Sequence, residues 1–197
     1  MALRKSLQAT LGAVTLMASM ALSVPTAQAA TSSARPDNAH PNCSMNVTTG
    51  HRHCFATFRE AISAATGGRV TDAPSTAKAG LADEHLTKEL NDPTSGTITP
   101  AAKTNVVIGI TYWDSNFAGP SYVYTAGNQC TDSTGDIDFQ VNIQNDWQNR
   151  ISSFVGFGNC YLKLWENTYW WGSSYGFSGS AGYLGAMDDR AKSIQWT

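Results

Sequence analysis

The sequence predicts an all-β fold built from two copies of one structural unit, and three observations support this prediction. Residues 112–119 and 165–172 share one pattern: an aromatic residue, four residues, a second aromatic residue, one residue and a glycine. The two copies start 53 residues apart, and each is followed by a polar run that ends in a serine. Short β-branched and aromatic segments, separated by Gly, Asn, Asp and Ser, fill the same region, as in a β-sandwich.

The repeated pattern is typical of a hairpin that folds back on itself. Gly119 and Gly172 suit the bend, because glycine adopts backbone conformations that are closed to residues with a side chain. Tyr112 and Trp165 can then lie over the bare backbone at these glycines. The later serine is suited to hydrogen-bond the unpaired backbone groups of such a hairpin.

With this pattern, residues 105–197 resemble the βγ-crystallin family. The Greek-key unit of that family consists of an aromatic residue, six residues, a glycine and a later serine, and two units pair into one sandwich. The resemblance implies eight residues that define the fold: Tyr112, Phe117, Gly119, Ser153, Trp165, Trp170, Gly172 and Ser193. The alternative is a coincidental aromatic-glycine repeat in another kind of β-sandwich.

The elements follow from local patterns along the chain. Seven strands are expected, at residues 106–113, 121–125, 138–143, 151–157, 161–165, 174–177 and 193–196. Two helices are expected before them, at residues 55–65 and 75–90, where apolar residues recur at helical spacing. Of the 20 aromatic residues, 18 lie between Tyr112 and Trp196, so the core is expected there.

The chain is therefore expected to divide into three parts. Residues 1–30 have a basic start, an apolar stretch and a small-residue cleavage site, which together predict a secretory signal peptide. Residues 31–104 are expected to form a linker, a small loop closed by Cys43 and Cys54, and a helical segment. This segment has too little apolar area to fold alone. The sequence leaves open whether it docks, stays loose or is removed. Residues 105–197 form the predicted β domain.

The charge argues against two classes of partner, and the cysteines of an exported chain predict disulfide bonds. Without residues 1–30 the chain carries 11 Lys and Arg against 15 Asp and Glu, a net charge of −4, which does not favour nucleic acid or a membrane surface as a partner. Four cysteines in an exported chain predict disulfide bonds, with three possible pairings. The local pairing, Cys43–Cys54 and Cys130–Cys160, follows the expected division. A zinc site near His51, His53 and Cys54 is the alternative.

The resemblance also implies calcium binding. Microbial members of the family bind Ca²⁺ with two Asn or Asp, two variable residues, Ser or Thr, and Ser, which supply hard oxygen ligands. Here the runs are residues 148–153 and 188–193, with Gln148 and Lys192 as departures. If the first position of one run joins the fifth of the other, Asp188 and Ser152 form the one plausible site. The prediction is one weak calcium site or no cofactor.

The sequence favours a secreted protein without catalytic activity. All four histidines of the mature chain lie in the N-terminal segment, and the sequence has no nucleophile elbow, zinc-protease motif or phosphate loop. Tyr169 and Trp171 are the candidate binding residues, and they either point outward or pack beneath the N-terminal segment.

The first function considered is an extracellular protease inhibitor, with the loop at residues 129–138 as its contact. The alternatives are an antimicrobial or cell-wall polysaccharide-binding protein and a calcium-stabilised structural protein. A monomer is expected.

Overall fold

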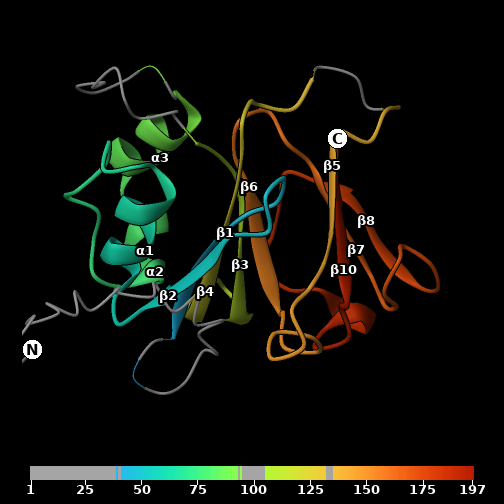
Figure 1. Ribbon diagram of the computed structural model, residues 1–197. Coiled ribbons are helices and arrows are strands. Elements are labelled where there is room, and N and C mark those ends of the chain that lie inside the picture. Colours follow the sequence, from blue (N-terminus) through green and yellow to red (C-terminus); the bar gives the residue numbers. More distant parts are fainter. Residues whose placement is uncertain (1–38, 40, 93, 95–104, 132–134) are drawn as a thin grey trace, which may run out of the picture. The chain divides into compact units, whose positions relative to one another are not determined.

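The computed structural model describes residues 39, 41–92, 94, 105–131 and 135–197. The expected signal peptide, and the expected linker at residues 31–38 and 95–104, lie outside these residues. The described strands form two sheets, shown in Figure 1. All the described elements belong to one compact unit, which spans the boundary expected between residues 104 and 105. The reason for this difference is that the N-terminal segment contributes strands and apolar side chains to the same sheet and cores.

Sheet A has six strands in the order β2-β1-β4-β3-β6-β9. Their bounds are Arg52–Phe55 (β2), Asn42–Asn46 (β1), Ala118–Ala126 (β4), Val106–Asp114 (β3), Ser153–Gly156 (β6) and Ser180–Ala181 (β9). Sheet B has four strands in the order β5-β10-β7-β8. Their bounds are Phe139–Asn142 (β5), Ser193–Trp196 (β10), Leu162–Trp165 (β7) and Ser174–Ser178 (β8).

The helices are Phe58–Ala65 (α1), Ala77–Leu81 (α2) and Glu84–Asn91 (α3), and Gly185–Met187 form a short 3₁₀ turn. The segment predicted as one helix at residues 75–90 is two helices. The chain breaks at Asp83, whose carboxylate accepts hydrogen bonds from the backbone of His85 and Leu86 and so caps α3.

The two repeated units exchange strands. Strands β3, β4 and β6 of the first unit lie in sheet A, but β5 of that unit pairs with β10 in sheet B. In the second unit, β7, β8 and β10 lie in sheet B, but β9 pairs with β6 in sheet A. Each sheet therefore contains strands from both units. This all-β, two-sheet arrangement is the architecture that the sequence predicts.

The main core lies between the two sheets and is built largely from aromatic rings. Tyr122 and Tyr124 stack with their ring centres 4.7 Å apart, and Trp147 packs edge-on against Tyr122 at 4.9 Å. Trp196 packs at 5.2 Å from Tyr124. Burial raises the pKa of both Tyr122 and Tyr124 above the usual range of a phenol, which favours the neutral form.

The two disulfide bonds pair as the sequence predicts, Cys43 with Cys54 and Cys130 with Cys160. The segment between the first two cysteines is not a simple loop, however. It is an antiparallel hairpin of β1 and β2, and β1 pairs in parallel with β4. Local patterns missed these strands because β1 alternates polar and apolar residues over only five positions. Its parallel partner, β4, lies about 80 residues away in the sequence.

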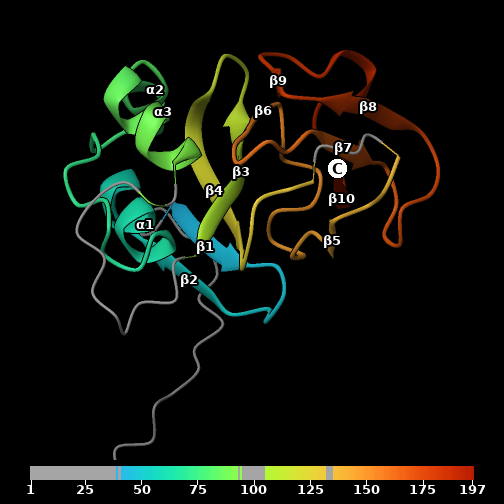
Figure 2. The same ribbon diagram turned by 90° about the horizontal axis from the view of Figure 1, so that it is seen from above.

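The helices cover the outer face of sheet A, the face turned away from sheet B. Phe58 and Ile62 of α1 and Leu90 of α3 belong to a second buried cluster with Ile110 and Val123 of the sheet. Figures 1 and 2 show the resulting layers of helices, sheet A and sheet B. The helical segment is thus docked, and it obtains from the sheet the apolar surface that it lacks by itself.

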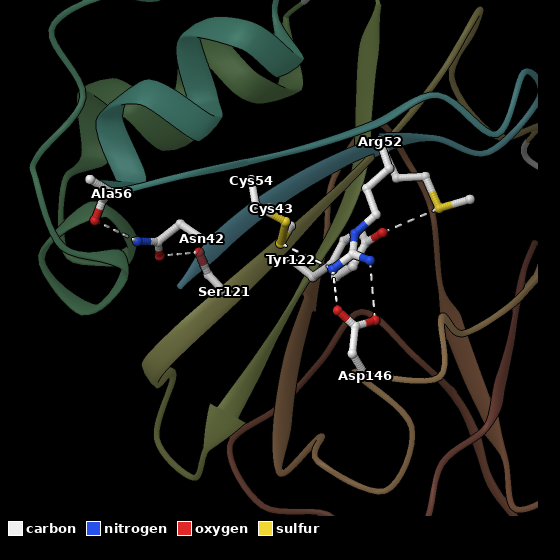
Figure 3. The surroundings of a disulfide bond; sticks show 9 residues. Asn42, Cys43, Arg52, Cys54, Ala56, Ser121, Tyr122 and Asp146 are labelled. Carbon is white, nitrogen blue, oxygen red and sulfur yellow. Dashed lines mark hydrogen bonds and ion pairs between the residues drawn. A yellow bond between two sulfur atoms is a disulfide. The ribbon is translucent and has the colours of Figure 1, made fainter. Parts of the chain in front are cut away.

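A nearly buried ion pair ties the β1–β2 hairpin to the loop after β5. The guanidinium of Arg52 donates two hydrogen bonds to Asp146, at 3.1 and 2.7 Å, and also lies over the ring of Tyr122 (Figure 3). The side chains of Arg52 and Asp146 are only 7% and 11% exposed. Because a charge at such depth is costly without its partner, this bidentate pair fixes the hairpin against the sandwich.

Candidate binding site

Both repeated hairpins have the same folded backbone. In the first, Asn116, Phe117 and Gly119 have φ values of 56°, 61° and 75°. In the second, the matching residues 53 positions later, at 169, 170 and 172, have φ values of 59°, 60° and 92°. Such left-handed conformations are unfavourable for residues with a side chain, so other contacts must hold them.

One serine hydroxyl holds each hairpin. Ser153 Oγ donates to Asp114 O at 2.6 Å and accepts from Phe117 N at 3.0 Å. Ser193 Oγ donates to Asn167 O at 2.6 Å and accepts from Trp170 N at 3.2 Å. Both serines are fully buried, and each hydroxyl satisfies two backbone groups of its hairpin.

At the two glycines, a side chain would strain the backbone and displace a neighbouring polar group. A Cβ atom at Gly119 would overlap the carboxylate of Asp114, and one at Gly172 would overlap the amide of Asn167. Together with their positive φ values, this explains why the pattern has glycine at both positions.

Tyr169 and Trp171 lie at the tip of the second hairpin, where 70% and 62% of their surfaces are exposed. They do not pack beneath the N-terminal segment as far as the structure describes it. Further bonds hold this tip: Tyr169 N donates to Asn142 Oδ1 at 2.8 Å, and Asn167 N donates to Trp171 O at 3.3 Å. The two rings are therefore presented on a fixed backbone.

An ion pair next to the tip adds to this rigidity. Arg190 donates a hydrogen bond to the carboxylate of Glu166, the residue after β7. This bond, with a smaller contribution from Ser173, lowers the pKa of Glu166 below its usual value. The carboxylate therefore stays ionised at neutral pH and remains paired with Arg190.

The two runs considered for calcium meet across the sandwich, but in a different register from the one expected. Ser152 Oγ donates to Asp189 Oδ1 at 3.3 Å, so it is the second position of one run that meets the fifth position of the other. Asp188, expected opposite Ser152, has an enclosed Oδ1 atom with no hydrogen-bond partner among the described residues. Asn149 and Asp189 have left-handed backbone conformations, and the N–H of each donates to a carbonyl of the partner run.

A polar hollow of about 430 Å³ opens beside these runs. Its walls are Trp113, Asp114, Gln148, Asn149, Arg150 and Asp189. The guanidinium of Arg150 lies 4.7 Å from the centre of the Trp113 ring. The carboxylates and amides are oxygen donors of the kind that Ca²⁺ accepts, but in the described part of the chain no three His, Cys, Asp or Glu residues gather closely enough to hold a metal. A calcium ion here would depend on backbone, amide and hydroxyl oxygens.

The described histidines give no catalytic arrangement. His51, His53 and His85 are exposed, and none of them lines the polar hollow. His85 lies 3.6 Å from Glu89 on the same helix, a surface pair one turn apart.

The comparisons with known proteins are sparse. No family model matches the sequence, and no curated protein matches it. Among solved structures, the chain is similar to the N-terminal domain of Protein S, with 14% identity and a TM-score of 0.36. The match covers 46% of this chain and 94% of that one.

Sequence reasoning missed one surface, the outer face of sheet B. This face carries Tyr161, Lys163 and Trp165, which alternate with the buried Leu162 and Leu164 along the chain. The alternation of aromatic or charged residues with leucine was a signal for it, because alternate residues of a strand point to opposite faces of a sheet.

The bonds of Ser193 lead to a prediction about stability. We expect Ser193→Ala to lower the free energy of unfolding by about 1–3 kcal/mol, because Trp170 N and Asn167 O would lose their buried partner. Urea unfolding followed by tryptophan fluorescence measures this change. Ser178→Ala is the control: Ser178 lies near the surface, its bond to Ser180 O is exposed, and the expected change is within about 0.5 kcal/mol. Equal effects of the two substitutions would contradict the role assigned to Ser193.

Proposed function

We propose that the protein is a secreted, non-catalytic binding protein that holds polysaccharide with Tyr169 and Trp171. The observation that carries this proposal is the pair of large rings, 70% and 62% exposed, on a hairpin tip fixed by several hydrogen bonds. Rigid aromatic side chains lose little conformational entropy on binding, and their faces stack well on the apolar faces of sugar rings.

Two further observations support a location outside the cell. The chain forms two disulfide bonds, which persist in oxidising compartments. The N-terminal sequence has the features of a secretory signal. As a separate finding, none of the helices in the described part of the chain has the length and apolarity needed to span a bilayer.

The proposal predicts that Trp171→Ala weakens binding to polysaccharide at least about fivefold, since truncation of an aromatic anchor costs more than about 1 kcal/mol. Retention of the purified protein on chitin, glucan and peptidoglycan measures this effect. Tyr183→Ala is the matched control, because Tyr183 is also a ring on the surface, 60% exposed, but lies in the loop after β9. If the unaltered protein is retained on none of these polymers and on no acidic polysaccharide, the proposed function is wrong.

A second candidate function is inhibition of an extracellular protease by the loop at residues 129–138. Residues 132–134 lie outside the described residues, but the ends of the loop are held firmly. Cys130 is bonded to Cys160, and Thr131 N donates to Asp138 Oδ2 at 3.1 Å. Ile137, beside this junction, is 42% exposed. These fixed ends and the exposed apolar side chain suit a protease cleft, because the described positions lose little freedom on binding.

This second candidate predicts that micromolar protein slows at least one metallo-, serine or cysteine protease and that Ile137→Ser weakens the inhibition. Hydrolysis of fluorogenic peptides measures both effects, with Tyr183→Ser as the control on another loop. Unchanged rates for every protease would remove this candidate.

Calcium binding is a third, separate proposal, which concerns stability. Asp189, Ser152 and the orphaned carboxylate oxygen of Asp188 are the side chains that support it. It predicts that about 10 mM Ca²⁺ raises the melting temperature by a few degrees, as expected for a ligand that binds only the folded state. Asp189→Asn should reduce this gain, whereas Asp72→Asn, on an exposed turn, should not. Calorimetry that finds neither heat of binding nor a shift in melting temperature would contradict the proposal.

A further inference from the structure

The outer faces of the two sheets differ, although the units that form them are repeated. On sheet A, Ile110 and Tyr112 are each 1% exposed and belong to the cluster that includes the helices. The positions 53 residues later are Lys163 and Trp165 on sheet B, and both remain partly exposed. No described helix packs on sheet B: every strong contact between a helix and a strand involves sheet A (Figure 2).

A row of polar side chains crosses the outer face of sheet B. The strand register places Gln140, Gln195 and Lys163 opposite one another on β5, β10 and β7. Gln195 Oε1 accepts from Trp165 Nε1 at 2.9 Å, and Gln195 Nε2 donates to Gln140 Oε1 at 3.2 Å. These bonds fix the amides in one orientation, so their remaining donors and acceptors point in defined directions.

Lys163 gives this face a positive charge that no described carboxylate neutralises. Its ammonium lies 4.1 Å from the centre of the Trp165 ring and 5.5 Å from that of Phe177. No ion pair involves Lys163 in the described part of the chain. The two rings hold the ammonium through cation–π attraction and leave its hydrogen-bond donors available to a ligand.

The surface around Lys163 carries exposed aromatic rings and glycines, which have no side chain. Tyr161 and Phe177 are 49% and 38% exposed. A side chain at Gly176 would meet nothing within 4 Å, and one at Gly179 would meet only the ring of Tyr161. Gly176 and Gly179 therefore leave room beside these two rings, and a ligand that stacks on them can extend over this part of the face.

We propose that the outer face of sheet B binds an acidic polysaccharide. Lys163 would take the anionic group of a sugar, Tyr161 and Phe177 would stack on the sugar rings, and the amides of Gln195 and Gln140 would bond hydroxyl groups. Fixed amides beside aromatic rings suit a sugar chain better than an acidic protein surface, because adjacent hydroxyls need both donors and acceptors in set directions. The proposal rests on the proposed function.

This face is continuous with the hairpin tip. Asn142, which receives the hydrogen bond from Tyr169 N, lies opposite Ser193 and next to the row of amides on β5. Ser193 in turn lies opposite Trp165. A polymer bound at Lys163 can therefore extend toward Tyr169, where the proposed function places its contacts.

The test compares two forms of one polymer, polygalacturonic acid and its fully methyl-esterified form, which has similar rings but no charge. With the full-length protein in affinity electrophoresis, we expect Lys163→Gln to weaken binding to the acidic form about tenfold or more and to leave binding to the ester nearly unchanged. Lys163→Arg, which keeps the charge, should retain most of the affinity. Lys88→Gln, on the exposed side of α3, is the control for net charge. Circular dichroism confirms that each variant is folded.

The outcomes separate this inference from the proposed function. If Lys163→Gln binds the acidic form as well as the unaltered protein does, the inference is wrong, even where Trp171→Ala reduces binding. If the protein binds polyglutamate as strongly as polygalacturonic acid, the inference is also wrong, and an acidic protein surface is the better candidate for the partner. Size-exclusion chromatography that shows a dimer disrupted by Lys163→Gln would identify the face as an interface between two copies and would also overturn it. Failure to bind any polysaccharide would overturn both proposals.

Discussion

The architecture depends on two buried hydroxyl groups. Each repeated hairpin has three residues in left-handed backbone conformations, and two of the three carry side chains. Such a backbone is unfavourable in isolation, and it leaves an amide and a carbonyl without a sheet partner. Ser153 and Ser193 bond both groups in their hairpins, from the strands β6 and β10. The hairpin and the distant strand therefore become ordered together, which explains why the pattern needs its glycine and its later serine at once.

Strand exchange extends this local constraint to the whole sandwich. Because β5 pairs with β10 and β9 pairs with β6, neither unit can complete its sheet from its own strands. The N-terminal segment then makes the two halves unequal. Its strand β1 pairs with β4, so that this side of sheet A ends at the short strand β2. Its helices cover the apolar outer face of sheet A. Because an exposed apolar face favours aggregation, this segment protects one half of the sandwich.

Much of the fold was predictable because its determinants are local and repeated. The seven expected strands correspond to β3 to β8 and β10, and both disulfide pairings are those that the sequence favours. Strands β1 and β2 were missed because their buried face depends on a partner distant in the sequence, and the two residues of β9 were too few for any pattern. At the candidate site, the hydrogen bond between Ser152 and Asp189 joins two distant runs, and no local pattern gives the left-handed φ of Asn149 and Asp189. The sequence does not show that the outer face of sheet B is open, because this depends on the helices packing on sheet A.

The contrast between Ile110 and Lys163 follows from what covers each position. Under the helices an unpaired ammonium would lose its water without gaining a partner, so a covered position favours an apolar side chain. At the uncovered position the long stem of Lys163 can lie on Trp165 while its charge remains in water. Strand β7, which carries Lys163, pairs with β10 on one side and β8 on the other. The hydrogen bond between Trp165 and Gln195 adds a side-chain link between β7 and β10. A ligand therefore meets groups whose positions are already set, and the binding free energy is not spent on ordering them.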